Sequence, residues 1–156
     1  IAKEQKLPRI VSIQNPYNLV NRSYEVGMSE ISIREKAGLL AYSPLAAGYL
    51  TGKYRNNQIP KNSRMDLFYD NYPRYHNERT YDAVEKYFSI AEKYKISLTQ
   101  LSQAFVNSRD FVTSNIIGAT TMKQLKENIG SINISLNQKI IEEINLIHEN
   151  IPNPAP

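Results

Sequence analysis

The stretch Leu39-Leu-Ala-Tyr-Ser-Pro-Leu-Ala-Ala-Gly48 places a short apolar run, Leu39–Tyr42, directly before a turn rich in Ser, Pro and Gly. Two comparable runs are Arg9–Ile13 and the apolar residues within Phe111–Gly118. A short apolar run bounded by turn residues is typical of a buried strand, above all in a parallel sheet. The sequence therefore predicts three short parallel strands.

Helical segments are expected between these strands. Residues around Glu25–Ala37 suit a helix that ends at Gly38, and apolar residues recur at helical spacing from Arg79 onward. Three capping boxes predict the starts of further helices: Ser97-Leu-Thr-Gln100, Thr121-Met-Lys-Gln124 and Ser135-Leu-Asn-Gln138. Strands that alternate with helices predict an α/β fold whose parallel sheet is covered on both faces.

The remaining segments are expected to be connections and ends. Thr51–Asn77 is polar, contains prolines and shows no clear period, which is typical of a functional or disordered loop. Ile1–Lys6 looks like the end of a helix that begins earlier, and Pro8 would terminate it. The Pro-rich tail Ile151–Pro156 is expected to be an exposed end, which leaves residues 1–150 as the folded unit.

Composition excludes several classes of site and partner. The 156 residues include no cysteine, so disulfides, thiolate metal sites and cysteine nucleophiles are excluded. The net charge of +4 is scattered rather than clustered, so nucleic acid is not an expected partner. No run approaches the ~18 apolar residues of a membrane span, so no membrane association is expected, and the cytoplasm is the expected compartment.

Three segments in order along the chain resemble the aldo-keto reductases: Ile13–Arg22, Leu40–Tyr54 and Ile117–Ile129. The resemblance is greatest to the branch with bacterial reductases and the β-subunits of voltage-gated potassium channels. Members of this family are (β/α)8 TIM barrels that use NADP(H) to reduce carbonyls. A closed barrel takes about 250 residues. The resemblance therefore implies that residues 1–150 are the C-terminal portion of such a barrel, with strands six to eight and their helices.

The resemblance places the family's catalytic Asp, Tyr, Lys and His on earlier strands, upstream of Ile1. This chain would then carry no catalytic residue and would be inactive alone. Asp70, Tyr75 and His76 mimic the spacing of a catalytic Asp and Tyr with a neighbouring His. They lie in a polar loop rather than at the end of a buried strand, so we do not expect them to act as a catalytic set.

The resemblance implies that two residues near strand ends bind the nicotinamide. Gln14, just past the first expected strand, would hydrogen-bond the carboxamide, because its amide offers both a donor and an acceptor. Tyr42, at the end of the second, would stack on the nicotinamide ring and leave one ring face open for hydride transfer.

The turn that follows resembles the turn that contacts the cofactor pyrophosphate in this family. Ser43, Leu45 and Gly48 would form this turn, in which glycine permits close backbone approach. Lys53 matches a basic residue beside it. Arg64 matches another basic position, in the loop that folds over the cofactor.

The last motif, from Gly118 onward, is a strand, a tight turn and a helix start, and the free N–H groups of a helix N-terminus suit an anion. By resemblance its residues contact the adenosine 2′-phosphate and the adenine: Gly118, Thr120, Lys123 and Gln124 near the phosphate, and Glu127 and Asn128 at the adenine. Many relatives carry a further cation where Gly118 or Gln124 sits. NADP(H) is the expected cofactor, although this departure weakens the implied preference over NAD(H).

Three functions remain open from the sequence. These are part of a reductase for a small carbonyl substrate, a cofactor-binding regulatory protein like the channel β-subunits, and a degenerate split-gene product. Three strands cut from a barrel leave open edges. We therefore expect the partner to be the N-terminal remainder of the barrel, in the same or a separate chain, or a second copy.

Overall fold

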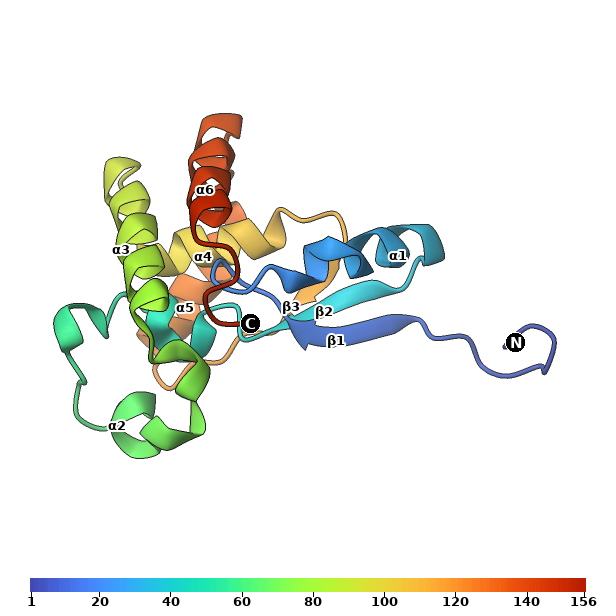
Figure 1. The fold of residues 1–156 in the computed structure, drawn as a ribbon, viewed down its shortest axis with the longest axis horizontal. Coiled ribbons are helices and arrows are strands. Elements are labelled where there is room, and N and C mark those ends of the chain that lie inside the picture. The colour runs from blue at the N-terminus through green and yellow to red at the C-terminus, as the bar shows by residue number, and fades with distance from the viewer.

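The computed structural model describes residues 1–156 and contains one parallel sheet with the strand order β1-β2-β3 (Figure 1). The strands are β1 (Ser12–Pro16), β2 (Gly38–Tyr42) and β3 (Val112–Asn115). The prediction of three parallel strands is confirmed, but β1 begins three residues later than expected. β1 continues through the Gln-Asn-Pro segment that was expected to be a loop.

Six α-helices accompany the sheet (Figure 1). Their bounds are α1 (Met28–Glu35), α2 (Arg64–Phe68), α3 (Glu78–Lys93), α4 (Leu98–Asn107), α5 (Met122–Gly130) and α6 (Gln138–Asn150). Short 3-10 turns fill several of the connections, including Ser23–Val26 before α1 and Ala46–Thr51 after β2. None of the helices is both long enough and apolar enough to cross a membrane.

The helix starts follow the expected caps in part. Ser97 and Gln100 form the full reciprocal capping box at the start of α4, as predicted. Thr121 caps α5, because its side chain accepts a hydrogen bond from the backbone N–H of Gln124. The prediction for α6 is wrong, since Asn137 rather than Ser135 is the N-cap.

The end of α1 also differs from the expectation. The helix stops at Lys36, which takes the left-handed conformation, and Gly38 is already the first residue of β2. A left-handed residue directly after a helix satisfies its last carbonyl groups, and here the N–H of Lys36 bonds to the carbonyls of Ser32 and Ile33.

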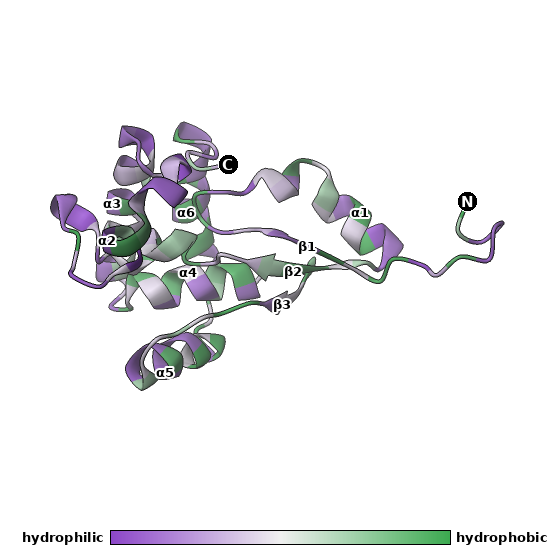
Figure 2. Cartoon of the chain, turned by 90° about the horizontal axis from the view of Figure 1, so that it is seen from below, coloured by the Kyte–Doolittle hydropathy of each residue, from purple (hydrophilic) through white to green (hydrophobic).

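The sheet is covered by helices on one face only, which corrects the expectation of two covered faces. Leu39 and Ala41 of β2 point to the covered face and are fully buried. The alternate positions Gln14 and Ser114 are exposed. Figure 2 shows hydrophobic segments in β2 and in the neighbouring α4. A parallel sheet with one bare face is the arrangement expected of part of a barrel wall, whose inner face meets the other strands.

The core lies between the covered face and the helices and comprises 26 buried residues. Its centre is aromatic, because Tyr17 stacks on Phe105 with ring centroids 5.9 Å apart and meets Phe111 edge-on at 5.2 Å. Phe105 lies in α4, and Tyr17 follows β1 directly. These rings therefore fix the end of β1 against α4.

The segment Thr51–Asn77 is more ordered than the sequence suggested. It contains α2 and several 3-10 turns, and it buries the side chains of Tyr54, Met65 and Tyr75. These apolar residues are spaced irregularly, so no helical or strand period revealed them. Ile1–Lys6, in contrast, forms only a hydrogen-bonded turn and no helix.

The C-terminal tail, residues 151–156, is docked rather than free, so the expectation of an exposed end is wrong. Ala155 is fully buried, and its N–H donates to the carbonyl of Val20 over 3.1 Å. The backbone N–H of Arg22 donates to Asn153 Oδ1 over 2.6 Å. Thr80 Oγ1 donates to the Pro154 carbonyl over 3.2 Å, so the tail joins the loop after β1 to the start of α3.

An ion pair between the buried Arg22 and the partly buried Glu25 secures the same loop. Arg22 donates to both carboxylate oxygens of Glu25, over 2.9 and 2.7 Å, and to Asn145 Oδ1 of α6 over 2.9 Å. The Tyr17 hydroxyl also donates to Glu25. Burial alone would raise the pKa of Glu25, but the hydrogen bonds from Arg22 and Tyr17 outweigh it and hold that pKa below its usual value.

This lowered pKa predicts acid sensitivity. Because the carboxylate of Glu25 is favoured in the folded chain, its contribution to stability is complete above the unfolded pKa of about 4.3 and is lost as the pH falls through the lower folded pKa. We expect the free energy of unfolding in urea to fall more steeply below about pH 4.5 in the wild type than in Glu25→Gln. Equal slopes for the two proteins would contradict this role for Glu25.

Candidate functional site

The carboxyl ends of the three strands meet at one edge of the sheet. The N–H of Tyr17, just after β1, donates to the Tyr42 carbonyl over 3.2 Å, and the N–H of Ile116, just after β3, donates to the Ala41 carbonyl over 2.8 Å. In parallel α/β sheets this is the edge at which ligand sites form. The loops that leave this edge carry nearly all the residues expected in a site.

Gln14 and Tyr42 lie on the uncovered face of the sheet. Gln14 is the third residue of β1 rather than a residue past its end, and it lies beside Leu40 of β2. Tyr42 is two residues further along β2, so it projects from the same face. Gln14 is exposed and Tyr42 is 39% exposed. Both side chains are therefore available on one surface.

The turn after Tyr42 has an unusual backbone. Ser43 (φ +56°), Ala46 (φ +48°) and Ala47 (φ +55°) all adopt left-handed conformations, followed by Gly48 at φ +104°. For a residue with a Cβ this conformation costs roughly 1–2 kcal/mol, so surrounding contacts must hold it. Leu45, which is half-buried, packs against the core and provides one such contact.

The predicted residues Gly48 and Lys53 are brought together. A Cβ built on Gly48 would lie 2.9 Å from Cε and 3.2 Å from Nζ of Lys53, so the lysine side chain passes directly over the glycine. Its ammonium group lies 5.0 Å from the centroid of the Tyr54 ring. The turn therefore presents a positive charge beside its left-handed backbone.

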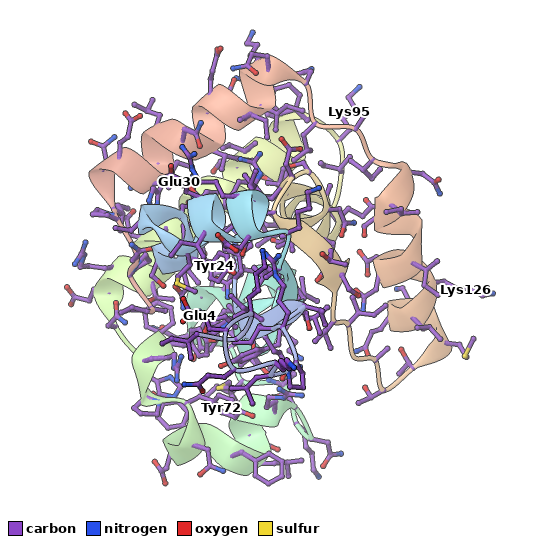
Figure 3. All side chains as sticks on the ribbon, turned by 90° about the vertical axis from the view of Figure 1, so that its right-hand side faces the viewer. Glu4, Tyr24, Glu30, Tyr72, Lys95 and Lys126 are labelled. Atoms are coloured by element: carbon purple, nitrogen blue, oxygen red, sulfur yellow. The ribbon has the colours of Figure 1, made fainter.

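Arg64 lies at the start of α2, and its side chain is exposed. Its guanidinium is 5.8 Å from the centroid of the Tyr72 ring, which Figure 3 labels. Burial raises the pKa of Tyr75, and the nearby positive charges of Arg74 and Arg64 oppose this rise.

The turn before α5 is hydrogen-bonded within itself. Gln124 Oε1 accepts from the N–H of Thr120 over 2.9 Å and from its hydroxyl over 3.0 Å. The expected capping box is therefore only half formed, because the Gln124 side chain reaches Thr120 instead of Thr121. Lys123 is exposed, and no ion pair holds it.

Glu127 and Asn128 already have partners in the chain. Asn128 is buried, and its Nδ2 donates to the carbonyl of Gly118 over 3.2 Å. Glu127 Oε1 accepts from the Ser97 hydroxyl over 2.5 Å, which ties α5 to the start of α4. No hydrogen bond or ion pair joins this region to Lys53 or Arg64, and Figure 3 shows α5, with Lys126, apart from the segment of Tyr72.

Asp70, Tyr75 and His76 are not linked to one another by hydrogen bonds. His76 Nδ1 is 2.7 Å from the Tyr49 hydroxyl, and its ring stacks on Tyr69 at 3.7 Å. Tyr75 is buried and Asp70 is exposed. The chain has no group of three or more His, Asp and Glu side chains that could hold a metal ion.

One buried residue of the site was missed by sequence reasoning. Asn18 is fully buried, and its Nδ2 donates to the carbonyl of Ser43 over 2.9 Å. It stands in a loop rich in Asn and Pro, where an amide side chain gave no signal of a partner 25 residues away.

Comparison with known proteins identifies the family. The model of the Aldo/keto reductase family matches residues 1–149. Protein tas of Escherichia coli is 46% identical over 156 residues, which is the whole chain but 45% of that protein. An L-glyceraldehyde 3-phosphate reductase of E. coli is 32% identical (85% of this chain, 39% of that protein). A probable voltage-gated potassium channel subunit beta of Arabidopsis thaliana is 35% identical (78% and 38%).

The chain thus spans less than half the length of each of these relatives. The match to the family model, in contrast, covers nearly all of the chain. It includes all three strand ends and the loops that follow them. The chain belongs to the aldo/keto reductase family.

Proposed function

We propose that the chain forms the C-terminal part of an NADP(H)-dependent TIM-barrel reductase of small carbonyl compounds and supplies much of its cofactor site. Family membership supports an oxidoreductase. The observation that carries the proposal is the placement of Gln14 and Tyr42 on one uncovered face, beside the left-handed turn that bears Lys53.

The residues present fit such a cofactor. The exposed Gln14 amide offers a donor and an acceptor to a carboxamide, and the exposed ring of Tyr42 offers a flat surface for stacking. Lys53 carries positive charge at the same turn, Arg64 carries another beside Tyr72, and the exposed Lys123 stands at the N-terminus of α5. NADPH supplies the hydride when bound, and these side chains orient it and balance its charge.

The bare face of the sheet and its unpaired edges imply a partner. The outer edge of β3 lies beside a cavity of about 440 Å³. Gln103 Nε2 and Asn115 Oδ1, among the residues that line this cavity, are buried without hydrogen-bond partners. Strands from the remainder of the barrel would pair with this edge, cover the bare face and bring the proton donor of the reaction. We expect the chain alone to be inactive and prone to association.

A binding experiment tests the proposal. The chain has eleven Tyr and no Trp, so quenching of tyrosine fluorescence would report NADPH directly, provided the partner segment lacks Trp. In the longest native polypeptide that contains residues 1–156, we expect Lys123→Ala to weaken NADPH binding about tenfold, because a charge-assisted hydrogen bond contributes about 1.5–3 kcal/mol. NADH binding should change little, since NADH lacks the 2′-phosphate.

Lys126→Ala is the matched control, since Lys126 is an exposed lysine one turn further along α5. It should leave both affinities within about twofold, the scale of an exposed surface charge. Equal losses for NADPH and NADH in Lys123→Ala would refute the 2′-phosphate contact. Absence of binding by the wild-type protein would refute the cofactor site itself.

The potassium-channel relative supports a second candidate, a regulatory protein that binds the cofactor without turnover. Carbonyl-dependent oxidation of NADPH separates the two. Turnover with any small aldehyde or ketone supports the reductase, whereas tight binding without turnover across a broad panel of carbonyls supports the regulatory protein.

A further inference from the structure

Every polar group of Asn18 is engaged. Its backbone N–H and carbonyl both pair with Asn21, over 3.0 and 3.1 Å. Its Oδ1 accepts from the N–H of Val20 over 2.9 Å, and its Nδ2 donates to the carbonyl of Ser43 over 2.9 Å. The side chain is fully buried. Asn18 is therefore a rigid bridge from the loop after β1 to the turn after β2.

The Ser43 carbonyl holds the conformation of that turn through two hydrogen bonds. It accepts a second hydrogen bond from the N–H of Ala46 over 2.9 Å, so both of its lone pairs are used. Ser43 is left-handed and precedes Pro44, a position that favours extended backbone instead. Without the bond from Asn18, the backbone between Tyr42 and Ala46 has a more favourable conformation available.

The loop of Asn18 is itself held from outside. The tail fixes Val20 through the N–H of Ala155 and fixes Arg22 through Asn153. Asn18 thus transmits the position of a firmly packed loop to the turn that follows Tyr42.

We propose that Asn18 is a positioning residue of the cofactor site. It holds Ser43 in its left-handed conformation, and so sets the Tyr42 ring and the turn carrying Gly48 in the geometry that binds the dinucleotide. Asn18 is fully buried, so it acts on the cofactor only through the backbone that it holds. This inference rests on the proposed cofactor site.

Asn18→Ala and Asn21→Ala form a matched pair for the test, made in the longest native polypeptide that contains residues 1–156. Asn21 is a buried asparagine of the same loop, but its side chain bonds only to Ser23. We expect Asn18→Ala to raise the Kd and KM for NADPH about tenfold with a smaller effect on kcat. A tenfold change corresponds to the loss of about one hydrogen bond. Asn21→Ala should change them less than threefold.

Asn18→Asp separates positioning from general damage to the fold. The aspartate keeps an acceptor for Val20 but, when ionised, presents an oxygen to the Ser43 carbonyl instead of a donor. A protonated carboxyl restores a donor, and its burial should raise the pKa at which this happens. We therefore expect the Kd for NADPH of Asn18→Asp, divided by that of the wild type, to fall toward one as the pH is lowered from about 8 to about 5.5.

A readout without cofactor gives an independent check. Ring resonances of Tyr42 in the free protein should shift in Asn18→Ala and stay unchanged in Asn21→Ala. Equal effects of the two substitutions on the Kd, an Asn18→Asp ratio that does not depend on pH, or unchanged Tyr42 resonances would each overturn the inference. Failure of the wild type to bind NADPH would instead overturn the proposed function, while the Tyr42 resonances would still decide whether Asn18 sets the turn.

Discussion

We expect Arg22→Met to lower the free energy of unfolding by about 3–5 kcal/mol, a loss that urea unfolding at pH 7 would measure. Arg22 is 6% exposed and donates two hydrogen bonds to Glu25 and one to Asn145, and its guanidinium lies 5.1 Å from the centroid of the Phe105 ring. Methionine fills much of the same volume but leaves the Glu25 carboxylate without its counterion. The loss should therefore arise chiefly from a partly buried carboxylate left without its counterion.

Two comparisons isolate this cause. Arg34 also pairs with a glutamate, Glu30, but both side chains are largely exposed, so Arg34→Met should cost less than about 1 kcal/mol. Adding Glu25→Gln to Arg22→Met should restore part of the stability, because it removes the stranded charge. A cost for Arg22→Met no larger than that of Arg34→Met would show that the buried pair is not important for stability.

Gly38→Ala should destabilise the fold by about 1–3 kcal/mol through overpacking. The new Cβ would lie 1.8 Å from Oγ1 and 3.1 Å from Cβ of Thr113, at the point where the register of β2 and β3 becomes irregular. The hydroxyl can rotate away, but the Cβ of Thr113 moves only with the strand. Thermal unfolding of the variant should show a clearly lower Tm.

The double variant Gly38→Ala with Thr113→Ala tests the contact. Removal of Oγ1 takes away the nearest atom, so the double variant should be more stable than Gly38→Ala alone. Gly130→Ala is the reference substitution, because nothing lies within 4 Å of its added Cβ and Gly130 is helical. It should stabilise the protein by up to about 1 kcal/mol. If Gly38→Ala left the stability unchanged, β3 would have to shift at little cost to make room for the new Cβ.

The parts of the fold that sequence predicts are those with local causes. The apolar run Leu39–Tyr42 and the capping box at Ser97 act over a few residues, and both elements form where expected. The start of α6 was misplaced because Ser135 and Asn137 are both good caps, two residues apart, and only packing selects between them. The docking of the tail depends on Val20 and Arg22, which no local pattern connects to it.

In the candidate site, too, some features were predictable from the sequence and others depend on packing between distant residues. Family resemblance identified Gln14 and Tyr42, and the parallel register puts them on one face; their role in binding stays a prediction. The bonds of Glu127 to Ser97 and of Asn128 to Gly118 were not foreseen, because they depend on how α5 packs. Asn18 was missed for the same reason, since its importance lies in a contact with a distant backbone carbonyl.

The docked tail also has a consequence for biosynthesis. The hydrogen bond from Arg22 to Asn153 joins residues 131 positions apart, and the one from Ala155 to Val20 spans a comparable distance. During translation the loop after β1 emerges well before residues 153–155 and gains these bonds only once those residues are free. A ribosome-bound nascent chain that ends before Asn153 should therefore hold this loop in a looser state, accessible to chaperones, until synthesis passes the tail.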